Sequence, residues 1–169
     1  MLVKHIMNTN VKTATRTTKI RDVAVLMCFN KISGVPVVEA GNRIIGLLSE
    51  KDILLAMYPK IDEFMLADQC LSLEELEHGY RDVLNLTVEE LMTHKVYTVA
   101  PEEPILRAAS VMFLHDIRRI PVAVDHQLVG IISIGDVHKA IFKENFDEQF
   151  HSSTQTVERR PESEYSARL

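Results

Sequence analysis

A serine and an aspartate recur together at two places in the sequence, in the stretches 46–52 (GLLSEKD) and 130–136 (GIISIGD). In each copy an apolar run ends at the serine and a helical pattern follows, which predicts a strand, a tight turn and a helix N-terminus. Free N–H groups and the helix dipole beside a serine hydroxyl suit a phosphate. The aspartate can accept hydrogen bonds from the two neighbouring hydroxyls of a ribose. The pattern therefore predicts a nucleotide-binding element.

The same four-residue spacing has a purely structural interpretation. In a capping box, Ser49 and Asp52 would only satisfy backbone donors of their own helix, and Ser133 and Asp136 would do the same. A single copy would favour this interpretation, because such caps are common. The recurrence of the motif within a longer matching frame favours nucleotide binding.

The whole chain is an internal repeat, which is the strongest signal in the sequence. Identical residues lie 85 positions apart, and after one deletion the offset becomes 84 for the glycine, serine and aspartate of the motif. The matching pairs at the first offset are Met7/Met92, Val11/Val96, Thr13/Thr98, Ile20/Ile105, Met27/Met112, Ile32/Ile117 and Pro36/Pro121. Two homologous halves follow from this.

Each half is predicted to fold as β-α-β-β-α, with a short extended piece, a helix, a proline-containing strand, a second strand and the helix after the motif. A proline inside a strand predicts an edge strand or an irregularity, and it leaves neighbouring backbone groups available to a ligand base. Helical spacing predicts one core stripe per half. The stripes are Ile20, Val23, Ala24, Met27 and Cys28, and then Ile105, Ala108, Ala109, Met112 and Phe113.

The domain boundaries follow from the repeat and from changes in composition. We expect one repeat in residues 1–59, an acidic helical insertion in 60–86, the second repeat in 87–150 and a disordered or loosely packed tail in 151–169. Two capping boxes are predicted outside the motif, from Ser72 to Glu75 in the insertion and from Thr87 to Glu90 at the start of the second repeat.

The composition limits the classes of partner. The chain has 169 residues, of which 46% are hydrophobic and 25% charged, as in soluble globular proteins. A net charge of −5 without a basic stripe argues against nucleic acid. Because no apolar run reaches about 20 residues and no signal-peptide core is present, we expect no membrane association and a cytoplasmic location. Cys28 and Cys70 fall at apolar positions and are predicted to be buried free thiols.

The assembled motifs resemble a tandem pair of cystathionine-β-synthase (CBS) domains, the stand-alone prokaryotic Bateman module. The resemblance covers about residues 3–58 and 87–142, and it is carried by the stretches 32–36 and 117–121 and by the doubled motif. It implies an α/β fold of two pseudo-twofold-related CBS repeats, each β-α-β-β-α, with a helical insertion between them. In this fold the halves pack sheet to sheet and leave two clefts.

The resemblance also implies an adenosine-containing ligand, such as AMP, ADP, ATP or S-adenosylmethionine. The aspartates would hold the ribose, the serines the ribose or phosphate, and the remaining stretches the adenine. Arg118 and Arg119 would contact phosphates, which makes the clefts unequal because the first half has Ser33 and Gly34 there. The residues assigned to the ligand are Val11, Lys12, Thr13, Ile32, Ser33, Gly34, Val35, Pro36, Ser49 and Asp52, with Val96, Tyr97, Thr98, Ile117, Arg118, Arg119, Ile120, Pro121, Ser133 and Asp136.

The expected function is therefore that of a regulatory module that senses an adenine nucleotide, with no catalytic residues, catalytic cofactor or metal. A nucleotide-processing enzyme is disfavoured, because no histidine stands at motif spacing from the serines and no H-E-x-x-H pattern occurs. A structural protein whose motifs serve only as helix caps is the other alternative. Output would pass through an unidentified effector protein or through a homodimer. The dimer is expected from the apolar residues Ile53, Leu54, Met57, Tyr58, Val137, Ala140, Ile141 and Phe142.

Overall fold

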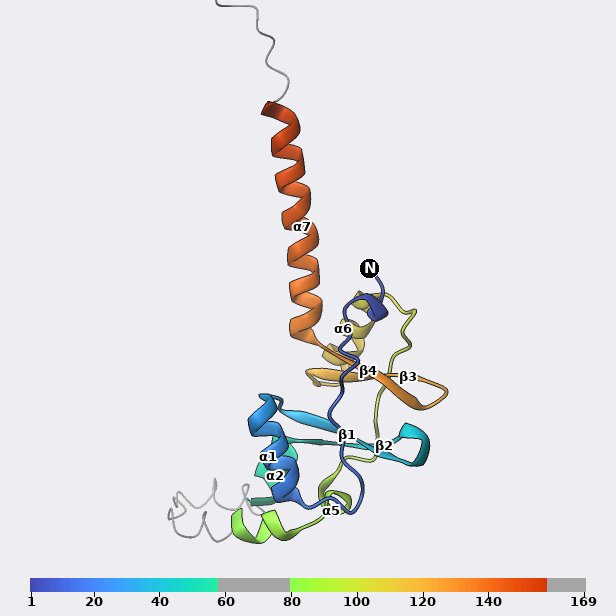
Figure 1. The fold of residues 1–169 in the computed structure, drawn as a ribbon, viewed down its shortest axis with the longest axis vertical. Coiled ribbons are helices and arrows are strands. Elements are labelled where there is room, and N and C mark those ends of the chain that lie inside the picture. Colours follow the sequence, from blue (N-terminus) through green and yellow to red (C-terminus); the bar gives the residue numbers. More distant parts are fainter. Residues whose placement is uncertain (58–79, 158–169) are drawn as a thin grey trace, which may run out of the picture.

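The computed structural model describes residues 1–57 and 80–157, and it contains the same succession of elements twice (Figure 1). The first half comprises η1 (Val3–His5), α1 (Ile20–Asn30), β1 (Gly34–Glu39), η2 (Ala40–Asn42), β2 (Arg43–Ser49) and α2 (Glu50–Met57). The second comprises α5 (Val88–Leu91), α6 (Ile105–Leu114), β3 (Arg119–Val124), β4 (Gln127–Ser133) and α7 (Ile134–Val157). The predicted α/β fold of two repeats is confirmed. The opening extended piece of each half is a single parallel bridge, from Ala14 to Val37 and from Val99 to Val122.

The strands form two antiparallel hairpins that join into one sheet of order β1-β2-β4-β3. The hairpins are paired to each other only at Arg43 and Gln127. Figure 1 shows them stacked, with α6 and the base of α7 on one side and α1, α2 and α5 on the other. The contact at the hairpin tips is reinforced by hydrogen bonds from the Ile44 N–H to the His126 carbonyl (3.0 Å) and from Asn42 Nδ2 to the Leu128 carbonyl (2.9 Å).

The proline-containing strands β1 and β3 lie at the two edges of this sheet, as predicted. Part of this outer edge is nevertheless occupied. The Pro36 carbonyl accepts from the Ala14 N–H (3.1 Å), and Pro121 accepts from Val99 in the same way (3.1 Å). These two carbonyls are therefore not available to a ligand base, because the extended piece of each half already pairs with them. A base contact with the backbone groups at the beginning of each strand stays a prediction.

The opening segments of the two repeats cross over, and each completes the core of the other repeat. Val3 is fully buried in the hydrophobic cluster of the second half, and Val88 is fully buried in that of the first. Each crossing is fixed by a reciprocal pair of backbone hydrogen bonds, between Asn8 and Ile131 (both 2.9 Å) and between Leu47 and Thr93 (3.0 and 2.9 Å). The chain then returns to its own half at Ala14 and Val99. Neither half therefore has a complete core without the opening segment of the other half.

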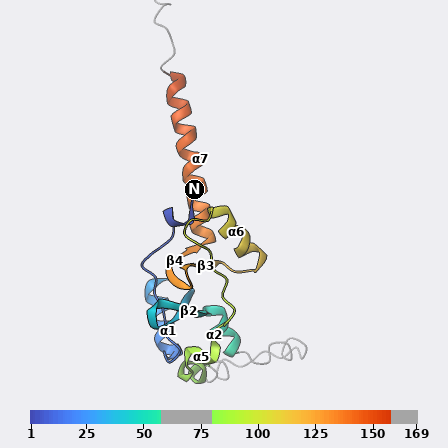
Figure 2. The ribbon, with the colours of Figure 1, turned by 90° about the vertical axis from the view of Figure 1, so that its right-hand side faces the viewer.

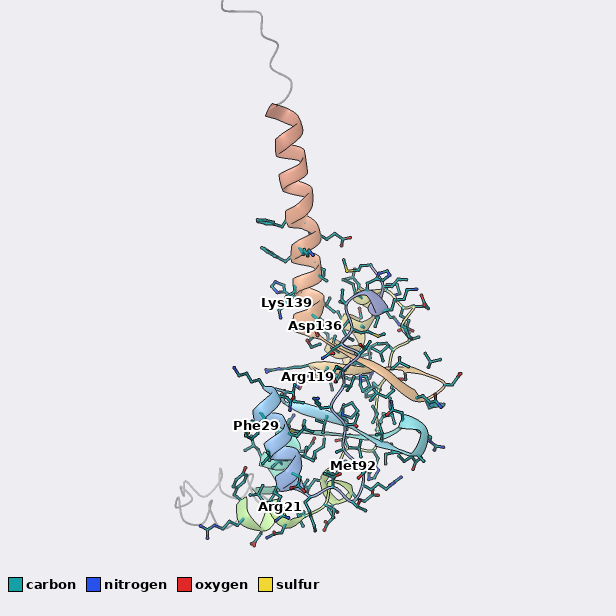
Figure 3. The ribbon with its side chains drawn as sticks, viewed as in Figure 1. Arg21, Phe29, Met92, Arg119, Asp136 and Lys139 are labelled. Atoms are coloured by element: carbon teal, nitrogen blue, oxygen red, sulfur yellow. The ribbon has the colours of Figure 1, made fainter. Side chains whose placement is uncertain are left out.

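The crossing explains why the repeated motif begins with glycine. A Cβ atom built on Gly130 would lie 2.7 Å from the sulfur of Met7 and 3.2 Å from the Asn8 carbonyl oxygen. A Cβ on Gly46 would lie 2.5 Å from the sulfur of Met92 (labelled in Figure 3). The glycines thus provide the space into which the methionine of each crossing segment packs.

Replacing Gly130 by alanine should therefore lower the unfolding free energy by about 1–3 kcal/mol, the usual cost of inserting a methyl group into a packed site. Gly135, which lies exposed in the first turn of α7, is the matched control, since its Cβ would meet nothing closer than 3.6 Å. Gly135→Ala should raise stability by about 0.5–1 kcal/mol through helix propensity. Urea denaturation followed by circular dichroism measures both changes, and equal effects of the two would contradict this assignment.

Three residues of the predicted core stripes lie outside the core. Ala24 is half-buried and does not belong to the hydrophobic cluster of the first half. Cys28 is exposed, and Phe113 is 71% exposed, whereas Ile20, Met27, Ile105 and Met112 are buried as predicted. In an α-helix, position i+8 lies about 80° around from position i, so these residues fall at the margin of the stripe. The prediction that Cys28 is buried is wrong. Cys70 and the Ser72–Glu75 box lie outside the described residues.

The C-terminal helix α7 continues through Val157, beyond the expected end of the second repeat at residue 150. It has 24 residues, corresponding to about 36 Å at ~1.5 Å per residue. It projects away from the hairpins in two perpendicular views (Figures 1 and 2). The rest of the expected tail, residues 158–169, lies outside the described part of the chain. Among the described residues, no helix combines the length and the apolar character needed to cross a membrane.

Candidate functional site

In each half the fold brings together the three stretches that were assigned to the ligand. The register of the hairpins places Gly34 opposite Ser49 and Arg119 opposite Ser133, so the beginning of one strand meets the end of the next. The parallel bridges at Ala14 and Val99 place residues 11–13 and 96–98 beside the beginnings of β1 and β3. The turn before each edge strand is tied to the following helix, since the Glu50 N–H donates to the Ser33 carbonyl and the Ile134 N–H donates to the Arg118 carbonyl (both 3.1 Å).

The serine and aspartate of each motif form a capping box. In the second half, Asp136 Oδ2 accepts from the Ser133 N–H (2.9 Å) and from the Ser133 hydroxyl (2.6 Å). The Asp136 N–H in turn donates to Ser133 Oγ (3.2 Å). Ser49 and Asp52 repeat this arrangement at 2.8, 2.6 and 3.3 Å. Among the described residues no hydrogen bond reaches the second carboxylate oxygen, Oδ1, of either aspartate. The box uses one oxygen of each carboxylate and leaves the other for a ligand.

The two halves differ most at the beginning of their edge strands. Arg119 occupies the position of Gly34, and its side-chain atom Nη1 is buried without a hydrogen-bond partner in the described part of the protein. Figure 3 places Arg119 between the two hairpins and Asp136 at the base of α7. Arg118, next to it, is exposed. A buried cationic donor without an acceptor costs free energy, which an anionic ligand would recover.

Tyr97 provides a flat surface in the second half alone. Its ring is stacked on that of His115, with centroids 3.6 Å apart and planes 11° from parallel. Lys95 Nζ lies 5.3 Å from the Tyr97 centroid, and hydrogen bonding to the Tyr97 hydroxyl raises the pKa of Lys95 above its usual value. The corresponding positions of the first half carry Lys12 and Asn30, 85 residues earlier.

Not every residue assigned to the ligand presents its side chain at this place. Val35 and Ile120 are fully buried within the two hydrophobic cores, so they support the site from beneath. Gly34, Pro36 and Pro121 are also buried. The assigned residues whose side chains are exposed or half-buried are Val11, Lys12, Thr13, Ile32, Ser33, Ser49, Asp52, Val96, Tyr97, Thr98, Ile117, Arg118, Arg119, Ser133 and Asp136.

The pattern analysis did not identify His115. No motif signals it, because the residue at the corresponding position of the first half is Asn30, whose amide donates to the Leu26 carbonyl at the end of α1 (2.8 Å). A comparison of the two repeats could have identified His115, because they differ at this position. The two repeats differ here, since a histidine stands at the end of α6 where α1 has an asparagine. This difference is of the same kind as that between Arg119 and Gly34.

Comparison with known proteins agrees with this architecture. The CBS domain matches residues 3–59 and 88–143, and the chain belongs to the CBS domain family. The protein MJ1426 of Methanocaldococcus jannaschii is 31% identical over 133 residues, which cover 71% of this chain and 79% of that protein.

Solved structures show the same fold. CBSX2 of Arabidopsis thaliana, solved in complex with AMP, superposes with a TM-score of 0.66 at 22% identity, over 85% of this chain and 98% of CBSX2. The CBS domain pair of MJ0100, solved in complex with 5′-methylthioadenosine and S-adenosyl-L-methionine, superposes with a TM-score of 0.63 at 23% identity, over 85% and 98% of the two chains.

Proposed function

We propose that this chain is a regulatory module that binds an adenosine-containing ligand at the beginnings of β1 and β3. The observation that carries the proposal is the buried Nη1 atom of Arg119, which has no hydrogen-bond partner among the described residues. Arg119 lies directly opposite Ser133, the residue before α7, on the neighbouring strand. A phosphate or carboxylate there would satisfy the guanidinium and the helix N-terminus together. The AMP complex of CBSX2 and the S-adenosyl-L-methionine complex of MJ0100 support this class of ligand.

The ribose is assigned to the carboxylates of Asp52 and Asp136. Each keeps Oδ1 clear of the capping box, and a carboxylate oxygen can accept two hydrogen bonds, one from each hydroxyl of the diol. Capping and ribose binding are therefore compatible. The Ser133 hydroxyl donates to Asp136 instead of facing a general base, so the motif provides no activated nucleophile, and we propose no chemical step.

Calorimetry with AMP, ATP, S-adenosylmethionine and adenosine tests the proposal, with two variants of Asp136. Asp136→Ala removes the helix cap and should lower the unfolding free energy by about 1 kcal/mol. It should also weaken ligand binding by about 1–3 kcal/mol. Asp136→Asn retains an oxygen for Ser133, so it should keep most of the stability while still weakening the ligand, because the carboxylate is gone.

The capping box of α5 is the matched control. Glu90 Oε2 accepts from the Thr87 N–H and hydroxyl (both 2.7 Å), and these bonds lower the pKa of Glu90. Glu90→Ala should destabilise the protein without changing ligand binding. If ligand affinity followed stability in all three variants, the motif would be a helix cap only, and the structural alternative would be correct.

We propose further that the module functions as a homodimer and passes its signal to a separate effector protein. Of the apolar residues on which the dimer was predicted, Tyr58 and the side chain of Met57 lie outside the described part of the structure, and Ile141 is half-buried. Ile53, Val137 and Ala140 are buried in their own halves, whereas Leu54 and Phe142 are 52% and 61% exposed. The largest exposed apolar side chains gather on α1 and α6, where Phe29 is 85% and Leu114 is 78% exposed. Helical faces of this kind are typical of association surfaces.

Light scattering should therefore give the mass of two 19.2-kDa chains at micromolar concentration. Phe29→Glu and Leu114→Glu should shift the mass to that of one chain without unfolding it, since both side chains are exposed. Val124→Glu, which changes a 46% exposed residue at the tip of the β3–β4 hairpin, should leave the dimer intact. A monomeric unchanged protein, with and without nucleotide, would contradict the dimer.

A further inference from the structure

The stack of Tyr97 and His115 joins two of the stretches that surround the proposed ligand. Tyr97 belongs to the extended piece beside β3, and His115 follows the last residue of α6. At 3.6 Å between centroids, the rings are in van der Waals contact, so no third ring fits between them in this arrangement. A flat ligand can therefore stack on either of the two ring faces that are in contact only if the other ring moves away.

Tyr97 is the fixed member of the pair. It packs against the hydrophobic cluster of the second half, and Val99, two residues on, is 3% exposed and hydrogen-bonded to both Pro121 and Ala123. Its hydroxyl interacts with Lys95, on the same extended piece. Displacing the Tyr97 ring would disturb this bridge to the edge of the sheet.

His115 is the movable member. Its backbone N–H donates to the Val111 carbonyl (3.2 Å), but no hydrogen bond to either imidazole nitrogen occurs among the described residues. The ring is half-buried, and its side chain is held in place by the contact with Tyr97. Rotation about its side-chain bonds can uncover Tyr97 without any change in α6.

We propose that His115 is a movable cover on Tyr97, and that the base of the ligand in the second half stacks on Tyr97 where the imidazole lies in this structure. The imidazole is a flat nitrogen heterocycle, so a purine can take its place at the same separation. The first half, with Lys12 and Asn30, has neither ring. Tyr97 is thus a specificity-determining residue that selects an aromatic base for the cleft containing Arg119. This inference rests on the proposed function.

Titration with adenosine and with ribose 5-phosphate tests whether His115 covers Tyr97. His115→Ala removes the competing ring and should raise the affinity for adenosine by about 2- to 10-fold, the range for one aromatic stack. Tyr97→Leu should weaken adenosine by a similar factor. Neither change should alter the affinity for ribose 5-phosphate, which has no base. Asn30→Ala is the matched change in the first half and should leave adenosine binding to the second half unaltered.

The imidazole protons of His115 give a second readout, because the Tyr97 ring shifts their NMR frequencies while the two are stacked. Saturating adenosine should move these signals toward those of an unstacked histidine. If His115→Ala bound adenosine more weakly, or if the imidazole signals did not move at saturation, His115 would not be a movable cover on Tyr97. The proposed function would be unaffected by either result. Failure of the unchanged protein to bind adenosine would overturn both.

Discussion

Replacing Val3 with alanine should lower the unfolding free energy by about 2–3 kcal/mol, although Val3 precedes both repeated helices. Its side chain is fully buried in the cluster formed by Ile105, Met112, Ile120 and Ile132. The change removes two buried methyl groups, worth about 0.8 kcal/mol each, and leaves a cavity in this core. Urea denaturation of the full chain measures the loss.

Two matched valines make the test specific. Val25→Ala, at a position of α1 that is 53% exposed, should change stability by less than about 0.5 kcal/mol. Val88→Ala should cost as much as Val3→Ala, because Val88 is the fully buried counterpart in the first half. Hydrogen exchange separates the two buried positions. Val3→Ala should lower protection mainly in α6 and β4, and Val88→Ala mainly in α1 and β2. If Val3→Ala instead lowered protection in the first half, or Val88→Ala in the second, the crossed arrangement would be contradicted.

The elements of this fold were predictable from the sequence, but the crossing was not. Apolar spacing identifies α1, α6 and the four strands because periodicity depends on each element's own neighbours. Val3 and Val88 lie outside these periodic stretches, and the spacing does not assign them to either core. Both cores offer equivalent positions, since they are copies of one another. The pairing is decided by backbone hydrogen bonds between the halves, among them those of Asn8 to Ile131 and of Thr93 to Leu47.

The motif itself could be located but not interpreted from the sequence alone. Capping and ribose binding demand the same residue types at the same spacing, because both depend on carboxylate and hydroxyl oxygens near a helix N-terminus. In the structure Oδ2 of Asp136 is used by Ser133 and Oδ1 is not, so capping and the proposed ribose contact would use different atoms. The initial glycine of the motif likewise had no explanation until Met7 was found packed over Gly130.

The difference between the halves at Arg119 leads to the prediction with the largest expected effect on the ligand. Replacing Arg119 by methionine keeps an unbranched apolar stem and removes the guanidinium group with its charge. An anionic ligand would then lose a charge-assisted hydrogen bond, worth about 1.5–3 kcal/mol, or roughly 10- to 150-fold in affinity. Adenosine, which has no phosphate, should bind almost as before. Calorimetry with AMP and adenosine in parallel measures the ratio, and raising the salt concentration should weaken AMP binding less in the variant than in the unchanged protein.

The same substitution should have the opposite effect on the free protein. Because Nη1 of Arg119 is buried without a partner in the described structure, its removal should raise the unfolding free energy in the absence of ligand by about 1–3 kcal/mol. Arg118→Met is the matched control: its side chain is exposed and its carbonyl, which holds the Ile134 N–H, is unchanged, so stability should stay constant. A site kept for a ligand is expected to show this combination of gained stability and lost phosphate affinity. If Arg119→Met instead destabilised the free protein, or if AMP and adenosine lost the same affinity, Arg119 would be a structural residue and the phosphate assignment would be wrong.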